Sequence, residues 1–152
     1  MVCYTMIALR AYFGFKLARY SGSLVHLHKE GHMPGKFLVN LTSGPENTDK
    51  ATVAFVIANA SVASDKDTVV FLSIEASRLS QKGVAETIHE EGFAPLKELV
   101  DNFVKAGGKI LVCSPCFKKR KLDEQNLVPG ATIVGGAKLV EFMSDDCPSV
   151  SY

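Results

Sequence analysis

Residues 107–116 read Gly-Gly-Lys-Ile-Leu-Val-Cys-Ser-Pro-Cys, and this stretch decides both the predicted fold and the predicted site. Residues 109–112 have the short, apolar, β-branched composition of a buried strand, and the glycine pair marks its start. Pro115 suits the first turn of a helix, because its fixed φ fits there and its missing N–H is not needed. The stretch therefore predicts a strand that ends at Cys113 and a helix with Cys116 in its first turn.

Two cysteines in this position are candidates for reactive thiols. The N–H groups of a helix N-terminus stabilise a thiolate, and the basic run 118–121 adds positive charge. The alternative is a pair of inert core residues, since buried free cysteines are common. A structural zinc site usually needs four ligands, and Cys3 and Cys147 lie far away in the sequence, so no metal is expected here.

Composition indicates an ordinary globular domain. The chain has 152 residues, 47% hydrophobic and 22% charged, which is enough to bury one sizeable core. Its formal net charge of +1 argues against a general nucleic-acid binder. No apolar run approaches the roughly 18 residues of a membrane span, so no membrane partner is expected. Few cysteines with a CxxC beside an α/β pattern favour a reducing, cytoplasmic location.

The first 32 residues differ from the rest. They are basic, carry one acid and show no clean periodicity, which is also the texture of a transit peptide. We interpret residues 1–32 as an N-terminal extension with few core contacts, and residues 33–152 as the α/β domain. Deleting the extension should then leave the melting temperature nearly unchanged. His26, His28 and His32 could hold a metal, but a solvated cluster without function is the preferred interpretation.

From residue 36 onward, strands and helices alternate. Strands are predicted at residues 36–41, 68–73, 109–112, 131–134 and 148–152. Helices are predicted at residues 48–62, 95–105 and 135–143, with a shorter piece at 84–89. In the first helix we expect the buried side to carry Val53, Val56, Ile57 and Ala60. This alternation predicts one parallel sheet of five strands with helices on both faces, a three-layer α/β/α domain.

In such sheets, ligands bind at the carboxyl ends of the strands, near the switch in strand order. Three segments should meet there: residues 42–47, 75–83 and 113–116. Ser43 lies in a turn that lacks the spacing of a P-loop. Glu75 could carry a proton or hydrogen-bond a thiol, although a solvated acid is an equal alternative. Lys118 belongs to a basic run that would usually be a solvated face, but it could also steer an acidic protein partner.

The chain from about residue 36 to 152 resembles the DsrE-like family of sulfur-relay proteins, which includes DsrE and TusD. The matching features are a strand followed by Thr-Ser-Gly-Pro at 42–45, the strand end Phe-Leu-Ser-Ile-Glu at 71–75, Ile-Leu-Val-Cys at 110–113, and Asn-Leu-Val-Pro-Gly at 126–130. The resemblance implies a flavodoxin-like fold and assembly into trimers or hexamers. It places the sulfur-accepting cysteine at Cys113, and a second cysteine at Cys116 is similar to a branch described as peroxiredoxin-like.

Two functions of different classes follow. The first is a sulfur carrier or sulfurtransferase, in which Cys113 takes a sulfane sulfur from a donor protein and passes it to an acceptor protein. Cys116 then resolves the persulfide, and no cofactor is needed. This chemistry asks for an accessible thiolate with a lowered pKa. The second is a non-catalytic oligomeric binding or redox-sensing module.

Overall fold

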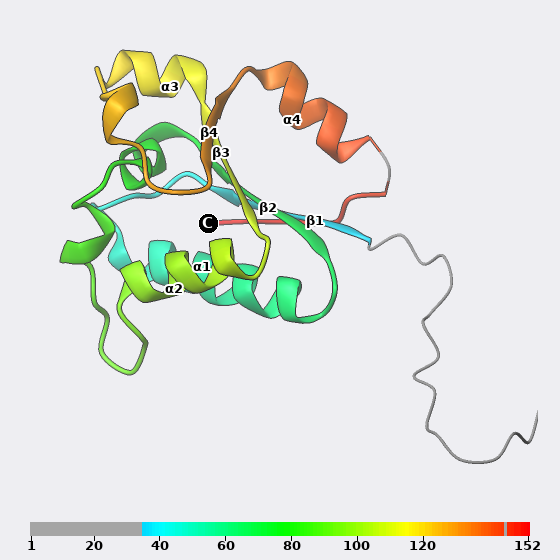
Figure 1. The fold of residues 1–152 in the computed structure, drawn as a ribbon, viewed down its shortest axis with the longest axis horizontal. Coiled ribbons are helices and arrows are strands. Elements are labelled where there is room, and N and C mark those ends of the chain that lie inside the picture. Colours follow the sequence, from blue (N-terminus) through cyan, green and yellow to red (C-terminus); the bar gives the residue numbers. More distant parts are fainter. Residues whose placement is uncertain (1–34, 145) are drawn as a thin grey trace, which may run out of the picture. The chain divides into compact units, whose positions relative to one another are not determined.

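A computed structural model of the chain describes residues 35–144 and 146–152 (Figure 1). The N-terminal extension, with its histidines and Cys3, lies outside the described residues, so the expectations about it stay predictions. No helix in the described part of the chain is long and apolar enough to cross a membrane.

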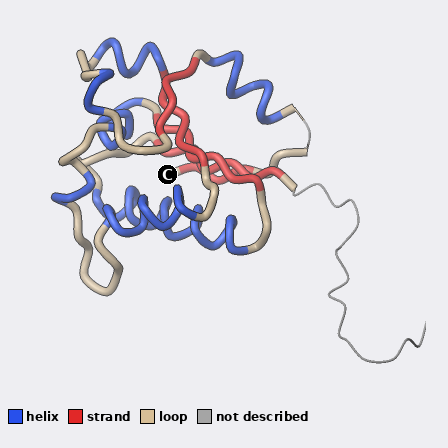
Figure 2. Tube along the Cα trace, viewed as in Figure 1, coloured by secondary structure: helices blue, strands red, loops and turns tan. Residues whose placement is uncertain are grey.

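Five parallel strands form a single sheet in the order β4-β3-β2-β1-β5. They are β1 (Lys36–Leu41), β2 (Asp67–Leu72), β3 (Lys109–Cys113), β4 (Ala131–Val134) and β5 (Ser149–Ser151). The predicted strands are confirmed within one residue at each end. The chain builds the sheet from β1 to β4 in one direction and then crosses to the opposite edge for β5. Figure 2 shows the strands in red with the helices in blue around them.

The helices lie on both faces of this sheet, as predicted. They are α1 (Thr48–Ala63), α2 (Leu96–Lys105), α3 (Ser114–Lys119) and α4 (Gly136–Met143), with the 3-10 helices η1 (Ile74–Ser80), η2 (Ala85–Thr87) and η3 (Glu124–Asn126). Figure 1 shows α1 and α2 side by side on one face and α4 on the other. The result is a flavodoxin-like α/β/α domain.

The period of two along each strand divides the core between the two faces. Val39 and Val70 point into the larger cluster under α1 and α2, where the rings of Phe55 and Phe103 meet edge to face at 6.0 Å. Their neighbours Leu38 and Val69 belong to a smaller cluster on the α4 face, and Phe71 completes it. Two separately filled cores therefore hold the sheet in place.

Two details of the prediction were wrong. The buried side of α1 carries Ala51, Thr52, Ala54, Phe55, Ala58 and Ser61, rather than the four residues expected. Apolar residues occur on every side of α1, so the sequence pattern did not single out one buried face. The small alanine side chains on the buried face let the helix lie close to the sheet. The segment expected as a loop after residue 74 begins with η1, in which the Ser77 hydroxyl donates to the Ile74 carbonyl at 2.8 Å. Such short 3-10 segments show no extended periodicity.

Candidate thiol site at the end of strand β3

The two thiols lie where β3 passes directly into α3. Cys113 is the last residue of β3 and caps α3, whereas Cys116 lies in the first turn of that helix together with Pro115. Both side chains are half-buried free thiols. Cys113 packs against the smaller core cluster beside Leu111 and Val134. The predicted placement of the CxxC at the carboxyl edge of the sheet is confirmed.

The three predicted segments do meet at this edge. The Ala76 N–H donates to the Thr42 carbonyl at 3.1 Å, which joins the β1–α1 loop to η1. Gly44 packs so closely that a Cβ there would lie 2.5 Å from the Glu75 carbonyl oxygen. The Ile74 N–H donates to Cys116 Sγ at 3.2 Å, which joins η1 to α3. The thiols at the end of β3 are separated by β2 and β1 from the switch in strand order between β1 and β5, where parallel-sheet ligands were expected.

Ile74 contributes to the thiol site, although the sequence did not predict a role for it. Its φ is 50°, in the left-handed region that β-branched residues rarely adopt, and its side chain is 52% exposed. This conformation turns the backbone sharply after β2 and aims the Ile74 N–H at the Cys116 sulfur. The sequence carried no signal for it, because isoleucine at the end of an apolar strand resembles one more strand residue.

Glu75 is tied to two arginines rather than to a thiol. Its Oε1 accepts from Arg120 Nη2 at 2.6 Å and from Nε at 3.1 Å, while its Oε2 accepts from Arg78 Nε at 2.8 Å. The hydrogen bonds from Arg120, and then those from Arg78, lower the pKa of Glu75 from 4.5 to about 2. A carboxylate with this pKa remains ionised near neutral pH, which does not suit a proton carrier.

Arg120 links this ion pair to the CxxC helix. Its side chain is only 8% exposed, and its Nη1 donates to the Cys116 carbonyl at 3.2 Å. Within the basic run 118–121 it resembles its neighbours in composition, but it lies four residues after Cys116 and therefore on the same side of the helix. The hydrogen bond to Glu75 raises the pKa of Arg120. Helical spacing could have separated it from the solvated lysines.

The electrostatics of Cys113 oppose the expectation of a lowered pKa. Burial raises the pKa of the Cys113 thiol, and a hydrogen bond with the Cys116 side chain raises it further, while the charge of Arg120 acts in the opposite direction. α3 has only six residues, so its N-terminus contributes less than a long helix would. Burial and the neighbouring Cys116 side chain therefore favour the protonated form of Cys113.

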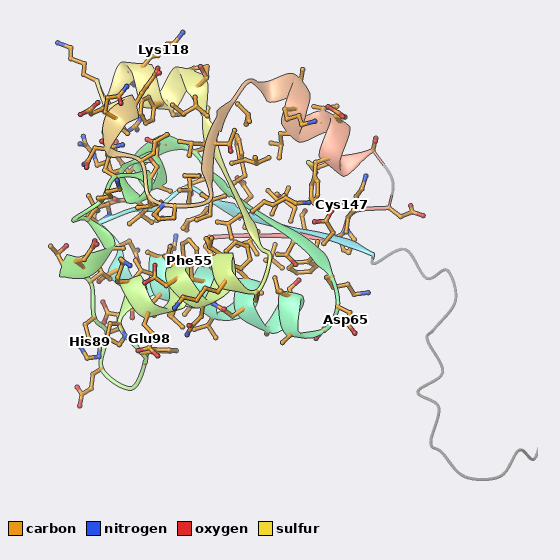
Figure 3. All side chains as sticks on the ribbon, viewed as in Figure 1. Phe55, Asp65, His89, Glu98, Lys118 and Cys147 are labelled. Carbon is orange, nitrogen blue, oxygen red and sulfur yellow. The ribbon has the colours of Figure 1, made fainter. Side chains whose placement is uncertain are left out.

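The other predicted supporting residues stand apart from the thiols. Ser43 is half-buried in the β1–α1 loop, and Lys118 is exposed on the outer side of α3 (Figure 3). Neither takes part in the hydrogen bonds of Cys113 or Cys116 given above. Cys147 lies beside the small core cluster on the α4 face, away from α3. Among the residues that the structure describes, no group of three or more acidic, histidine or cysteine side chains could hold a metal ion.

Comparisons with known proteins agree with this architecture. The chain is 29% identical over 108 residues to the uncharacterized protein MJ0760 of Methanocaldococcus jannaschii, and the match covers 71% of this chain and 39% of that protein. It is 26% identical to the uncharacterized protein MJ0989 of the same organism, over 77% of this chain and 99% of the relative.

Solved structures show the same fold. The ychN protein from E. coli aligns with a TM-score of 0.64 at 14% identity, over 77% of this chain and 99% of that one. MTH1491 from Methanobacterium thermoautotrophicum, a protein of unknown function, aligns with a TM-score of 0.56 at 13% identity, over 78% and 99% of the two chains. The DsrE/DsrF-like family matches residues 35–148, which include strands β1 to β4 and end just before β5. The chain belongs to the DsrE/DsrF-like family, whose members are associated with sulfur relay.

Proposed function

We propose that the protein is a small sulfur-relay carrier that holds sulfane sulfur as a persulfide on Cys113, with Cys116 as the resolving thiol. The observation that carries this proposal is the pair of half-buried free thiols at the carboxyl edge of the sheet, in a family associated with sulfur relay. No metal or cofactor is needed, because a thiolate alone can accept sulfur by exchange.

Loading is a thiol–disulfide type exchange. The Cys113 thiolate attacks the outer sulfur of a donor persulfide, the donor S–S bond breaks, and the donor leaves as a thiolate. Burial keeps Cys113 mostly protonated, but nucleophilicity rises with pKa, so the thiolate that does form is a strong attacker. Cys113 attacks as the thiolate, and its proton passes to solvent beforehand, because the side chain is only half-buried.

The proposed partners are a donor protein and an acceptor protein in a reducing, cytoplasmic compartment, since persistent thiols require one. We further propose a homotrimer or homohexamer. Val140 is 68% exposed, and Met143 on the same helix is exposed as well, which leaves apolar surface for a second copy to cover. Sedimentation at micromolar concentration tests this, because a species at the chain mass of 16.4 kDa would contradict it.

The test of function is sulfur loading from glutathione persulfide, followed by intact-mass measurement. Cys116→Ser, which cannot resolve the persulfide, should gain one sulfur atom, and a Cys116→Ser/Cys147→Ser control should gain the same, while Cys113→Ser should gain none. The alternative is a non-catalytic oligomeric binding or redox-sensing module, which the half-buried, unbridged thiols also allow. Such a module would gain no sulfur and would only form or lose an internal disulfide.

A further inference from the structure

We propose that Ile74, Glu75 and Arg120 form a bracket that positions Cys116 for its reaction, with the Ile74 N–H as the donor to negative charge on the Cys116 sulfur and Arg120 as the positioning residue. The inference rests on the proposed function, in which Cys116 resolves the persulfide. It names the groups that act on the second cysteine, for which sequence reasoning predicted only a helix N-terminus.

The first part of the bracket is the strained turn at Ile74. A β-branched residue at φ 50° costs free energy, and more than half of its side chain faces solvent, so the side chain does not explain the conformation. The backbone on both sides holds it instead. Ser73 N–H donates to Leu41 O at 3.0 Å, and Ala76 N–H donates to Thr42 O at 3.1 Å. This turn directs the Ile74 N–H at Cys116 Sγ rather than at a neighbouring strand.

The second part is the guanidinium of Arg120. It donates to one Glu75 oxygen through two nitrogens and to the Cys116 carbonyl through the third. Arg78 occupies the other Glu75 oxygen, so both oxygens of the carboxylate are engaged by arginines. The Arg120 guanidinium therefore links Glu75, which follows the N–H donor Ile74, to Cys116, whose sulfur accepts that hydrogen bond. Lysine cannot reproduce this, because it presents a single nitrogen.

The chemistry gives the bracket its purpose. In resolution, the Cys116 thiolate attacks the Cys113 Sγ of the loaded persulfide, and a Cys113–Cys116 disulfide forms as the bond from Sγ to the outer sulfur breaks. The outer sulfur takes the electron pair and leaves as hydrosulfide, so the two cysteines are oxidised by two electrons and the sulfane sulfur is reduced by two. A dithiol reductant then restores both thiols. The charge before attack lies on Cys116 Sγ, where the Ile74 N–H is aimed.

The groups that act on the thiol pair come from two elements. Arg120 is the residue that caps the C-terminus of α3, and it pairs with Glu75 of η1, which in turn pairs with Arg78 of the same element. Lys118 and Lys119 share the helix with Cys116 but are exposed. Lys118→Gln is thus a matched control, because it removes one positive charge from the same helix without touching the bracket.

The experiment uses the full chain without any sulfur donor, so its outcome is independent of whether the protein loads sulfur. In a pH titration followed by NMR, the Ile74 amide proton should move downfield as Cys116 ionises, and this step should vanish in Cys116→Ser. Iodoacetamide alkylation of Cys116, in a Cys113→Ser background at one fixed pH, should slow about tenfold in Arg120→Gln and in Arg120→Lys. Lys118→Gln should change the rate less than twofold.

Several outcomes would overturn the bracket. One is an Ile74 amide that ignores the ionisation of Cys116. Another is an Arg120→Lys variant that reacts like wild type, or a Lys118→Gln variant that slows as much as Arg120→Gln, since charge alone would then suffice. Ile74→Gly keeps both the N–H and the left-handed φ and should retain the wild-type rate. If Arg120→Gln fails to fold, Glu75→Gln tests the same link from the other side and should slow the reaction in the same direction.

Discussion

Gly44→Ala tests whether the β1–α1 loop holds the thiol site together. The added Cβ would lie 2.5 Å from the Glu75 carbonyl oxygen and 2.8 Å from its carbon. These are backbone atoms, so no side chain can swing aside. To reach an ordinary contact of 3.4 Å, the gap has to open by about 0.9 Å. The Ile74–Glu75 backbone must move, and with it an N–H that now lies 3.2 Å from Cys116 Sγ.

The expected loss in free energy of unfolding is about 1–3 kcal/mol, the usual cost of forcing extra volume into a packed site. Gly44 does not have a positive φ, so the substitution brings no conformational penalty, and reduced freedom of the unfolded chain would by itself stabilise by about 0.4–1 kcal/mol. A net loss therefore measures the clash. Urea unfolding gives the midpoint, and an unchanged slope would show that the unfolded state is unaffected.

The matched control is Gly136→Ala in the first turn of α4, where an added Cβ meets nothing within 4 Å. It should be neutral or stabilise by up to about 1 kcal/mol, since alanine favours helix. Alkylation of Cys116 should fall in Gly44→Ala and stay at the wild-type rate in Gly136→Ala. A Gly44→Ala protein as stable as wild type, with unchanged thiol reactivity, would refute the contact between this loop and the site.

Three further predictions concern stability. The Thr52 hydroxyl is buried without a hydrogen-bond partner among the described residues, so Thr52→Val should raise the free energy of unfolding by about 1–2 kcal/mol in urea, and a loss would contradict this. Because the folded pKa of Glu75 is lowered from 4.5 to about 2, its stabilisation should be full above pH 4.5 and disappear as the pH falls towards 2; Glu75→Gln should flatten that part of the urea midpoint curve. Burial raises the pKa of Cys147 above its ordinary 9.0, so its contribution to the free energy of unfolding is full below pH 9.0 and is lost at higher pH. An equal loss of stability at alkaline pH in Cys147→Ala would contradict this assignment.

The sequence was most informative where one physical rule acted alone. Short apolar or β-branched runs predicted all five strands. In the second helix the sequence predicts a stripe of Leu96, Leu99, Val100 and Phe103; three of these are buried in α2, and Leu99 is half-buried. The sequence did not predict the buried side of α1, because apolar residues occur on every side of this helix and packing against the sheet decides which side is buried. Periodicity describes a single element, so it does not report which of two apolar faces a neighbouring sheet will cover.

The thiol site likewise has some features that the sequence predicted and others that it did not. Both thiols and their place at the sheet edge followed from local pattern, because a strand end and a helix start are local features. The partners of Cys116 did not, since they depend on a left-handed residue 42 positions away and on one arginine among several basic residues. Hydrogen bonds between distant segments are fixed by tertiary structure, and a charge run in the sequence does not reveal which of its members turns inward.

In the proposed mechanism Cys113 carries the sulfur and Cys116 resolves the persulfide. The most direct measurement is to load the Cys116→Ser protein with glutathione persulfide, trap it with an alkylating reagent and map the extra sulfur by peptide mass spectrometry. We expect the sulfur to stay on Cys113 in this variant, whereas wild type releases hydrosulfide and forms the internal disulfide. Extra sulfur that is absent from Cys116→Ser but present on Cys116 in a Cys113→Ser protein would contradict the assignment and reverse the two roles.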